Sequence, residues 1–315
     1  MLLIDSIYAT VDTLKVMVPP IVIGFFLANF IRSSGYFNRL CQPTASLAFF
    51  SHLPSSCAGA ITLFLVNNWA SLSMLSEEHR MRGLSERELI ISTLVGSIPK
   101  GLNNALLYTI PVAISVLGLQ TGAIYVVLEA FANFFVASIG IVIGRLILNS
   151  EHLELFVENT HESSHWWKRI EPSLLECISS SKKILKTLIP TIFLAQLAIN
   201  YILLHPIAEM YNSLIQPFGF PSSSLLVLLA SVVSQSAALV ASGTLLDNLS
   251  ISPKQCLILM FMARCLHRGI GFMRVGIPVY VSYFGGTLGI RVATIEYFLI
   301  EISNVLAILL IILLL

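Results

Sequence analysis

Apolar stretches long enough to cross a bilayer recur along almost the whole chain. Crossing about 30 Å of hydrocarbon takes about 20 predominantly apolar residues in a helix. In the first half, such stretches are residues 14–31, 44–75, 89–118 and 122–148. Polar residues interrupt the second stretch, and Pro99-Lys100-Gly101 interrupts the third. The pattern predicts membrane helices, because the short alternation and regular turn spacing of an outer-membrane barrel are absent.

The second half repeats this order of elements. Its apolar stretches are residues 185–204, 218–246, 255–284 and 290–315. One long polar stretch separates the two halves. We therefore divide the chain into a first membrane repeat, a polar linker and a second membrane repeat, at residues 1–148, 149–184 and 185–315.

Residues that are rare in so apolar a chain match between the halves at nearly constant spacing. At a separation of 171, Lys15, Pro19 and Asn29 correspond to Lys186, Pro190 and Asn200. At a separation of 167, Pro54-Ser55-Ser56 corresponds to Pro221-Ser222-Ser223, and Glu129 to Glu296. Duplicated halves in a membrane protein usually enclose a solute site between them. The repeat therefore indicates transport.

Composition agrees with this interpretation. The chain is 56% hydrophobic and 11% charged, with a mean hydropathy of +0.85, which is far from an ordinary soluble domain. Residues 1–13 have no basic segment, so we expect no cleavable signal peptide. The five cysteines show no CxxC spacing, which argues against a disulfide framework or a zinc site. We expect an all-α polytopic membrane protein without a bound cofactor or metal.

The distribution of Lys and Arg predicts that the halves have opposite orientations. Cytoplasmic loops are enriched in these residues. Arg32 and Arg39 occupy the first loop, whereas the corresponding loop of the second half, 205–213, has neither residue type. These loop positions agree with one another if each half crosses the membrane three times and residues 44–75, like 218–246, re-enter the membrane or cross it as a hairpin. We expect a multi-pass protein of the cell membrane with a cytoplasmic linker and external termini.

The linker has two interpretations. Trp166 and Trp167 with the following basic pair favour an amphipathic helix at the membrane interface, in contact with lipid headgroups. His161 and His165 stand four residues apart near two glutamates, which would also suit a metal site. The interfacial helix is the stronger interpretation, because polar linkers often collect such residues.

Basic residues concentrate in the middle of segment 255–284. They are Arg264, His267, Arg268 and Arg274, with glycines between them that favour a helix break. In the 167 register His267 aligns with Lys100, which is followed by Asn103 and Asn104. Broken helices expose positive dipole ends, and arginine offers a planar fork to phosphate or carboxylate. The pattern predicts an anion-binding centre, unless these cations pair internally with Glu129, Glu296 or Glu301.

Glu129 and Glu296 occupy equivalent positions in the last span of each half. Ionisable groups within membrane segments are functional candidates by default. Each glutamate could bind a coupling H+ or Na+, contact a solute hydroxyl, or serve as a counter-charge to the basic residues.

Polar residues also recur in the hairpin regions. The Pro-Ser-Ser sequences place Ser55, Ser56, Ser222 and Ser223 where we expect solute-facing hairpin tips. Asn67-Asn68 and Ser234-Gln235 are equivalent pairs inside apolar segments. Asn68 and Gln235 could bind a polar solute through hydrogen bonds, or they could form hydrogen bonds that hold helices together.

The duplicated pattern around PSSCAGAITLFLVNN and GSIPKGLNNALLYTIPV, matched by PSSSLLVLLASVVSQ and the stretch through GIPV, resembles the nucleoside-recognition or Gate-domain family of membrane proteins. The resemblance covers residues 14–315 apart from the linker. The matching part of the chain is similar to the core of concentrative nucleoside transporters. The resemblance implies a carrier core with solute contacts at hairpin tips and helix breaks.

The leading hypothesis is a secondary transporter for an organic anion or nucleoside-like metabolite. A translocase for lipid-linked phosphates is a variant. A non-transporting membrane subunit of a complex is the second class, and it predicts that every charge within the membrane is paired. We do not expect an enzyme, because no Asp-rich metal motif accompanies the basic cluster. We expect no nucleic-acid partner, because the basic residues outside the membrane are dispersed.

Overall fold

The computed structural model describes residues 44–148 and 219–314, except positions 45, 82 and 222, together with isolated helical positions in the two remaining stretches. The predicted linker, with its interfacial helix and candidate metal ligands, lies outside the described residues. The same holds for Ser222 and for most of the predicted spans 14–31 and 185–204.

The described parts of both halves are helical, as predicted. The first half contains α3 (Ser55–Leu63), α4 (Asn68–Met81), α5 (Glu86–Val95), α6 (Ser97–Asn104), a π-helical segment η1 (Ala105–Thr109) and α7 (Ile110–Ile147). The second half contains α10 (Ser224–Val233), α11 (Gln235–Asp247), α12 (Pro253–Gly271), a π-helical segment η5 (Phe272–Gly276), α13 (Ile277–Phe284) and α14 (Gly286–Leu314).

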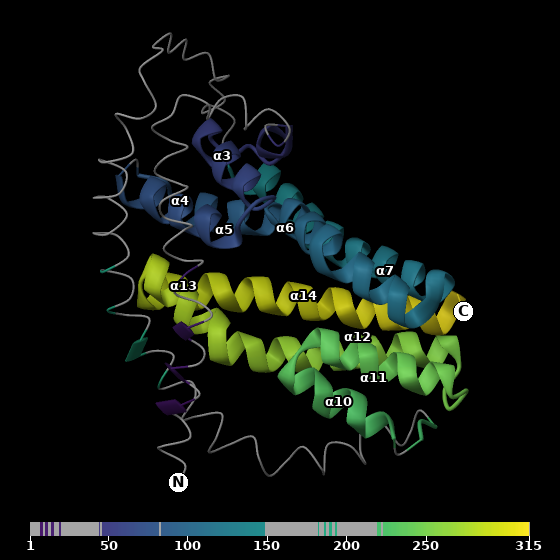
Figure 1. Ribbon diagram of the computed structural model, residues 1–315. Coiled ribbons are helices and arrows are strands. Elements are labelled where there is room, and N and C mark those ends of the chain that lie inside the picture. Colours follow the sequence, from purple (N-terminus) through teal and green to yellow (C-terminus); the bar gives the residue numbers. More distant parts are fainter. Residues whose placement is uncertain are drawn as a thin grey trace, which may run out of the picture.

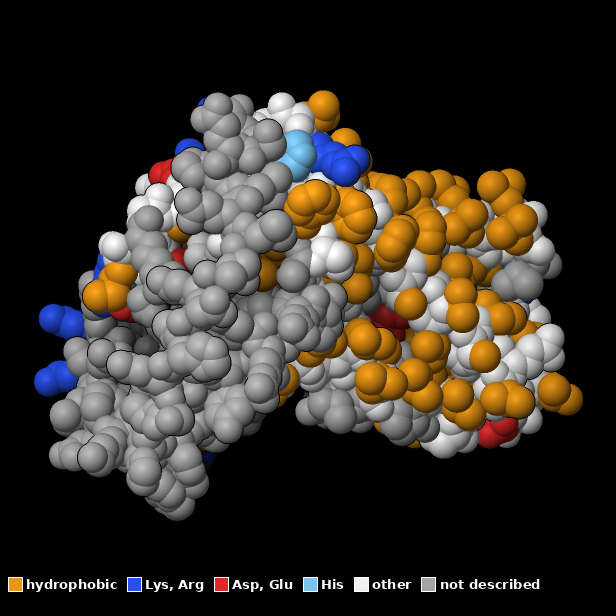
Figure 2. Space-filling view, turned by 90° about the horizontal axis from the view of Figure 1, so that it is seen from above, with side chains coloured by type: hydrophobic (Ala, Val, Ile, Leu, Met, Phe, Trp, Pro, Cys, Tyr) orange, Lys and Arg blue, Asp and Glu red, His pale blue; other side chains and the backbone are white. Residues whose placement is uncertain are grey.

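Among the described residues, three stretches of helix are long and apolar enough to cross a membrane. They are Val112–Ile147, Pro253–Phe284 and Gly286–Leu314. Large apolar side chains are exposed on these helices, and Figure 2 shows hydrophobic side chains covering much of the described surface. An apolar exterior of this kind is what a helical membrane protein presents to lipid.

Local geometry recurs between the halves at the 167 spacing. Ser85 and Ser252 each begin a helix with a reciprocal capping box, in which the third helical residue, Glu88 or Gln255, accepts a hydrogen bond from the serine N–H. Gly118 and Gly285 each bend the chain with a positive φ, 77° and 86°. The two halves therefore share backbone structure as well as residues.

The two π-helical segments have a common cause in the sequence. A proline follows each of them, at Pro111 and Pro278, near the start of the next helix. Proline has no N–H to donate to the carbonyl four residues earlier, which lies within the π-helical segment. Each segment therefore widens the helix where a regular hydrogen bond is missing.

The sequence predicted helix breaks around Pro99-Lys100-Gly101 and among the glycines of the basic stretch. The structure interrupts the regular helix near both positions, although not at the predicted residues. In the first half, α5 ends at Val95 and α6 begins at Ser97, because proline is tolerated in the first turn of a helix, where α6 places Pro99. In the second half, α12 continues through the basic residues to Gly271, and the irregular backbone follows in η5.

The hairpin tips also differ from the prediction. Ser55 and Ser56 are the first residues of α3, and Ser223 immediately precedes α10. The chain instead turns at the polar pairs. Asn67 accepts hydrogen bonds from the N–H groups of Trp69 and Ala70 at the start of α4, and Ser234 accepts from Ala237 at the start of α11. Ser, Asn and Asp are favoured at this position because their side chains cap the first turn.

The long helices α7 and α14, which correspond in sequence, lie next to each other (Figure 1). Near the start of both helices, Glu86 of α5 pairs with Arg291 of α14, so these helices are parallel. Gly140 of α7 packs on Leu94 and Gly144 on Ile91, so α7 beyond its bend is antiparallel to α5. The last part of α7 therefore lies antiparallel to α14, its counterpart in sequence.

Each hydrophobic core is built from both halves. One core joins α3, α4 and α5 to α13, where Tyr280 and Tyr283 are buried against them. The other joins α10, α11 and α12 to the first part of α7, through Ala113, Leu117 and Tyr125. The helix hairpin of one half (α3–α4 or α10–α11) thus packs against the bent helix of the other (α13–α14 or α7).

The α13–α14 bend depends on a close backbone approach at Gly289. A Cβ at this position would lie 2.4 Å from the carbonyl oxygen of Tyr280, whereas a Cβ at Gly286 would meet nothing within 4 Å. We expect Gly289→Ala to destabilise the protein by about 1–3 kcal/mol, because backbone atoms must move. The matched control, Gly286→Ala, is expected to unfold at the wild-type temperature. Thermal unfolding in detergent measures both, and equal midpoints for the two variants would contradict the packing described.

Candidate functional site

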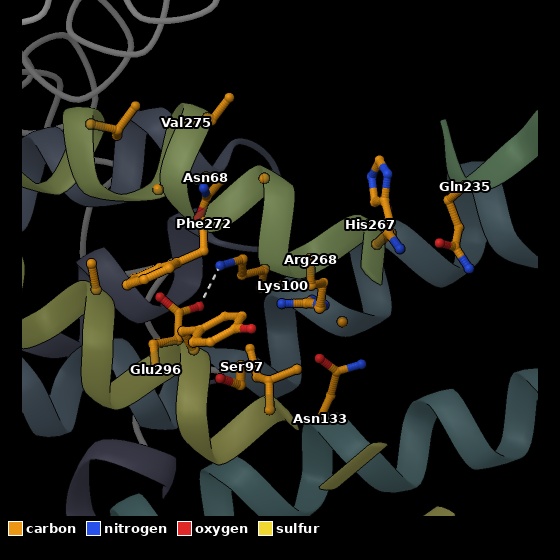
Figure 3. A pocket seen from close by; sticks show the side chains of 18 of the residues that line it. Asn68, Ser97, Lys100, Asn133, Gln235, His267, Arg268, Phe272, Val275 and Glu296 are labelled. Carbon is orange, nitrogen blue, oxygen red and sulfur yellow. Dashed lines mark hydrogen bonds and ion pairs between the residues drawn. The ribbon is translucent and has the colours of Figure 1, made fainter. Parts of the chain in front are cut away.

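A cavity of about 830 Å³ lies between the two halves (Figure 3). Its walls come from α4, α6 and α7 of the first half and from α10, α11, α12, η5, α13 and α14 of the second. Eleven of the residues that the sequence singled out line this cavity: Asn68, Lys100, Asn103, Asn104, Glu129, Gln235, Arg264, His267, Arg268, Arg274 and Glu296.

Lys100 is held by a glutamate of the other half. Its Nζ lies 2.6 Å from Oε1 of Glu296, the contact drawn as a dashed line in Figure 3. The hydroxyl of Tyr280 donates to the second oxygen of the same carboxylate. Glu296 is therefore neutralised by α6 and oriented by α13, and it acts as a counter-charge in this conformation.

The second glutamate makes the reciprocal pair. Nη1 of Arg264 lies 2.9 Å from Oε1 of Glu129, and both side chains are almost completely buried. Asn104 donates to the same oxygen at 3.3 Å. Each half thus supplies one carboxylate and one cation, and both ion pairs cross from one half to the other.

Arg268 differs from these two cations. It makes no hydrogen bond or ion pair with any residue that the structure describes, although the charges of Glu129, Glu296 and Arg264 act on it. Figure 3 shows it beside Lys100, at the cavity. Among the lining residues, the cations Lys100, Arg264 and Arg268 outnumber the carboxylates of Glu129 and Glu296. The lining therefore carries an excess of positive charge.

His267 and Gln235 lie in another part of the cavity (Figure 3). Nδ1 of His267 lies 2.6 Å from the carbonyl oxygen of Ser231. Because a carbonyl only accepts, we assign the proton to Nδ1. The amide of Gln235 donates to the hydroxyl of Tyr125 at 3.0 Å. His267 is thus tied to α10 rather than to the ion pairs.

Several hydrogen-bonding atoms at the cavity have no partner within the described part of the chain. They include Oδ1 of Asn68, Oε1 of Gln235 and Oγ of Ser97. Asn68 and Gln235 are the first residues of α4 and α11 and correspond in the repeat. Buried polar atoms normally find a partner, in the protein, in water or in a ligand. These atoms are therefore candidates for solute contacts.

Some lining residues gave no signal in the sequence. Asn133 lies one helical turn after Glu129, and its side chain donates back to the Glu129 carbonyl at 2.9 Å. Phe272 and Tyr297 stack with ring centroids 4.4 Å apart, and Trp69 adds a further aromatic surface. The spacing of Asn133 from Glu129 could have revealed it, but aromatic residues are too common in this chain to stand out.

The predicted serine contacts do not occur at this cavity. Ser55, Ser56 and Ser223 are not among its lining residues. The reason is that they begin α3 and α10, whereas the cavity is reached by the other ends of these helices, at Phe64 and Val232. No group of three or more His, Cys, Asp or Glu side chains suited to a metal ion occurs among the described residues.

The relatives found by comparison are archaeal proteins. The chain is 26% identical over 295 residues to the uncharacterized protein MJ0880 of Methanocaldococcus jannaschii, across 92% of this chain and 94% of that protein. It is 23% identical to the uncharacterized protein MJ0871 of the same organism, across 86% of this chain and 84% of that protein. No family model matches the chain, and no solved structure gives a significant match. The first similarity extends through both halves.

The buried ion pair predicts an asymmetric response to mutation. We expect Arg264→Met to destabilise the protein by about 3–5 kcal/mol, because it leaves the Glu129 carboxylate buried without a cation. Lys100→Met should cost less, because the Lys100 side chain is 30% exposed and solvent can replace part of the contact. Adding Glu129→Gln to Arg264→Met should restore much of the loss. Thermal unfolding of the three variants checks this order, and a double variant no more stable than Arg264→Met would contradict the pairing.

Proposed function

We propose that the protein is a membrane transporter, a secondary carrier for an organic anion or nucleoside-like metabolite. The observation that carries this proposal is the cavity between the two halves, lined by an excess of cationic side chains. A charged side chain within a membrane segment is costly, and an excess of one sign in an enclosed space favours a solute of the opposite sign.

Arg268 is the residue that supports an anionic solute most directly. The two carboxylates at the cavity are engaged by Lys100 and Arg264. Arg268 forms no ion pair with any described residue, so a phosphate or carboxylate in the cavity could contact it directly. The planar guanidinium suits both groups, because it donates two parallel hydrogen bonds to them.

The other residues that line the cavity indicate which chemical groups the rest of the solute carries. Phe272, Tyr297 and Trp69 offer aromatic surface for a flat or apolar portion. The amide oxygens of Asn68 and Gln235 accept hydrogen bonds from hydroxyl or amino groups. An anion with a flat, polar-edged body meets all three features.

The antiparallel arrangement supports transport by alternating access. We interpret the two halves as inverted repeats, with a cytoplasmic linker and external termini in the cell membrane, in agreement with their Lys and Arg distribution. The hairpin helices α3 and α4 have nine and 14 residues. Each is too short to cross the hydrocarbon alone, which needs about 20 residues, so we interpret this region as re-entrant. The crossed ion pairs are contacts that rearrange when one half moves against the other.

A non-transporting membrane subunit is the alternative from a different class. That role favours a packed interior in which every charge within the membrane is paired. The cavity and the position of Arg268 argue against it. We likewise infer no enzymatic activity, no bound cofactor other than a coupling ion, and no nucleic-acid partner.

A binding experiment on the full chain in detergent tests the proposal. We expect sodium sulfate, sodium benzoate or adenosine 5′-monophosphate to raise the thermal unfolding temperature, with uncharged adenosine giving a smaller effect. Arg268→Ala should weaken the affinity for the stabilising anion by about 30-fold or more, because a buried charge partner is lost.

Arg291→Ala is the matched control, because it also removes one arginine of the second half but lies in an exposed pair with Glu86. It should retain wild-type affinity. Uptake of the stabilising anion into liposomes containing the protein then separates a carrier from a binding protein. No stabilisation by any of the three anions, or equal losses in the two arginine variants, would rule the proposal out.

A further inference from the structure

A third glutamate of the second half, Glu301, lies near the middle of α14 and outside the ion pairs. It stands at the edge of the helix face that exposes Phe298, Ile302 and Val305, and it is itself only partly buried. An ionised carboxylate at this depth in a membrane helix is costly unless it is paired or reached by water. Glu301 therefore needs either a cation or a proton.

Within the described residues, several hydrogen-bonding atoms around Glu301 lack a partner of good geometry, although Cys265 and Asn304 lie within its reach. Oε1 of Glu301 is buried without a hydrogen bond, and the same is true of both amide atoms of Asn304, a residue with no exposed surface. Asn304 lies beside Glu301, as does Cys265 of α12. A neutral carboxyl group could donate its O–H to Oδ1 of Asn304, whereas a carboxylate cannot donate.

The cation without a partner lies on the helix that faces Glu301. Arg268 follows Cys265 by one helical turn on α12, and its charge acts on Glu301. Glu129 and Glu296 are held by Arg264 and Lys100. Arg268 can thus form an ion pair with Glu301 or with an anion in the cavity. One guanidinium cannot fully neutralise both.

We propose that Glu301 is the carboxyl group that takes up a coupling proton, and that it competes with the transported anion for Arg268. This inference rests on the proposed function. Ionised Glu301 draws Arg268 toward α14. When water delivers a proton to Glu301, the neutral carboxyl turns its O–H to Asn304, and Arg268 is released to bind the anion. The proton and the anion then bind with positive cooperativity, which is the requirement for moving them together.

Other groups near Glu301 could also respond to pH. Arg264, Arg268 and Cys265 face it from α12, and Tyr297 and Glu296 lie on the preceding turns of α14. From α7, Glu129 is held by Arg264. His267 lines the cavity, and histidine is the side chain that ordinarily changes charge near neutral pH. His267 is therefore the competing proton site that an experiment must separate from Glu301.

The test measures the affinity of the full chain for sulfate, benzoate and adenosine 5′-monophosphate at pH 6 and pH 8, in sodium-free potassium buffer. Sulfate and benzoate keep their charge over this range, whereas the phosphate monoester loses a proton at about pH 6. For adenosine 5′-monophosphate, the quantity compared is therefore the difference in pH dependence between the wild type and Glu301→Gln. In the wild type, we expect the affinity for the stabilising anion to fall by about tenfold or more as the pH rises, within the limit of about tenfold per pH unit for one linked proton. Glu301→Gln mimics the protonated carboxyl, so its affinity should match the wild-type value at pH 6 and no longer depend on pH. His267→Gln should retain the pH dependence.

Each outcome decides between the hypotheses. A pH dependence that persists in Glu301→Gln overturns the inference, and its disappearance in His267→Gln assigns the proton to His267. A wild-type affinity that is independent of pH also overturns the inference. In both cases anion binding, and with it the proposed function, still stands. Absence of binding by all three anions at both pH values instead rejects the proposed function. Uptake into liposomes under an inward proton gradient gives a second readout, in which Glu301→Gln should exchange anion but not accumulate it.

Discussion

The need to neutralise buried charge governs how the two halves fit together. Glu129 and Glu296 lie within apolar helices where water cannot stabilise them, and each is paired with a cation of the other half. Removing either cation leaves a buried carboxylate, which is far more costly than losing an exposed ion pair. The register between α6 and α14, and between α7 and α12, is therefore set by two short electrostatic contacts. The cavity between these helices follows from the same contacts.

The hydrophobic cores reinforce this arrangement. Each core combines the hairpin of one half with the bent helix of the other, so apolar packing and charge pairing hold the same two surfaces together. The bends themselves depend on glycine, because Gly118 and Gly285 adopt positive φ angles. The prolines after η1 and η5 widen the helices beside the cavity. Small local features thus determine where a large polar space can exist inside an apolar protein.

The sequence predicted the helical class and the three long spans of the described region well, because apolar stretches of that length have few alternatives in a membrane. It also singled out Lys100, Arg264, Arg268 and the two paired glutamates, since charges stand out in such a chain. It failed where local chemistry allows two outcomes. The helix break was expected around Pro99, but it lies at Gly96, because proline fits the first turn of the new helix α6. The crossed pairing could not be predicted, because it depends on how the halves pack and not on the spacing within either.

The exchange of partners between the halves limits how such a protein can be divided or assembled. One half alone contains a carboxylate without its cation, a cation without its carboxylate and a hairpin without the surface that buries it. Under the proposed inverted repeat, two copies of one half would meet these needs by lying antiparallel, with each copy inserted in the opposite sense. A single-half ancestor would then have had to enter the membrane in both orientations. Fusing two such copies through a linker would fix one orientation for each and leave their cavity-lining residues free to diverge.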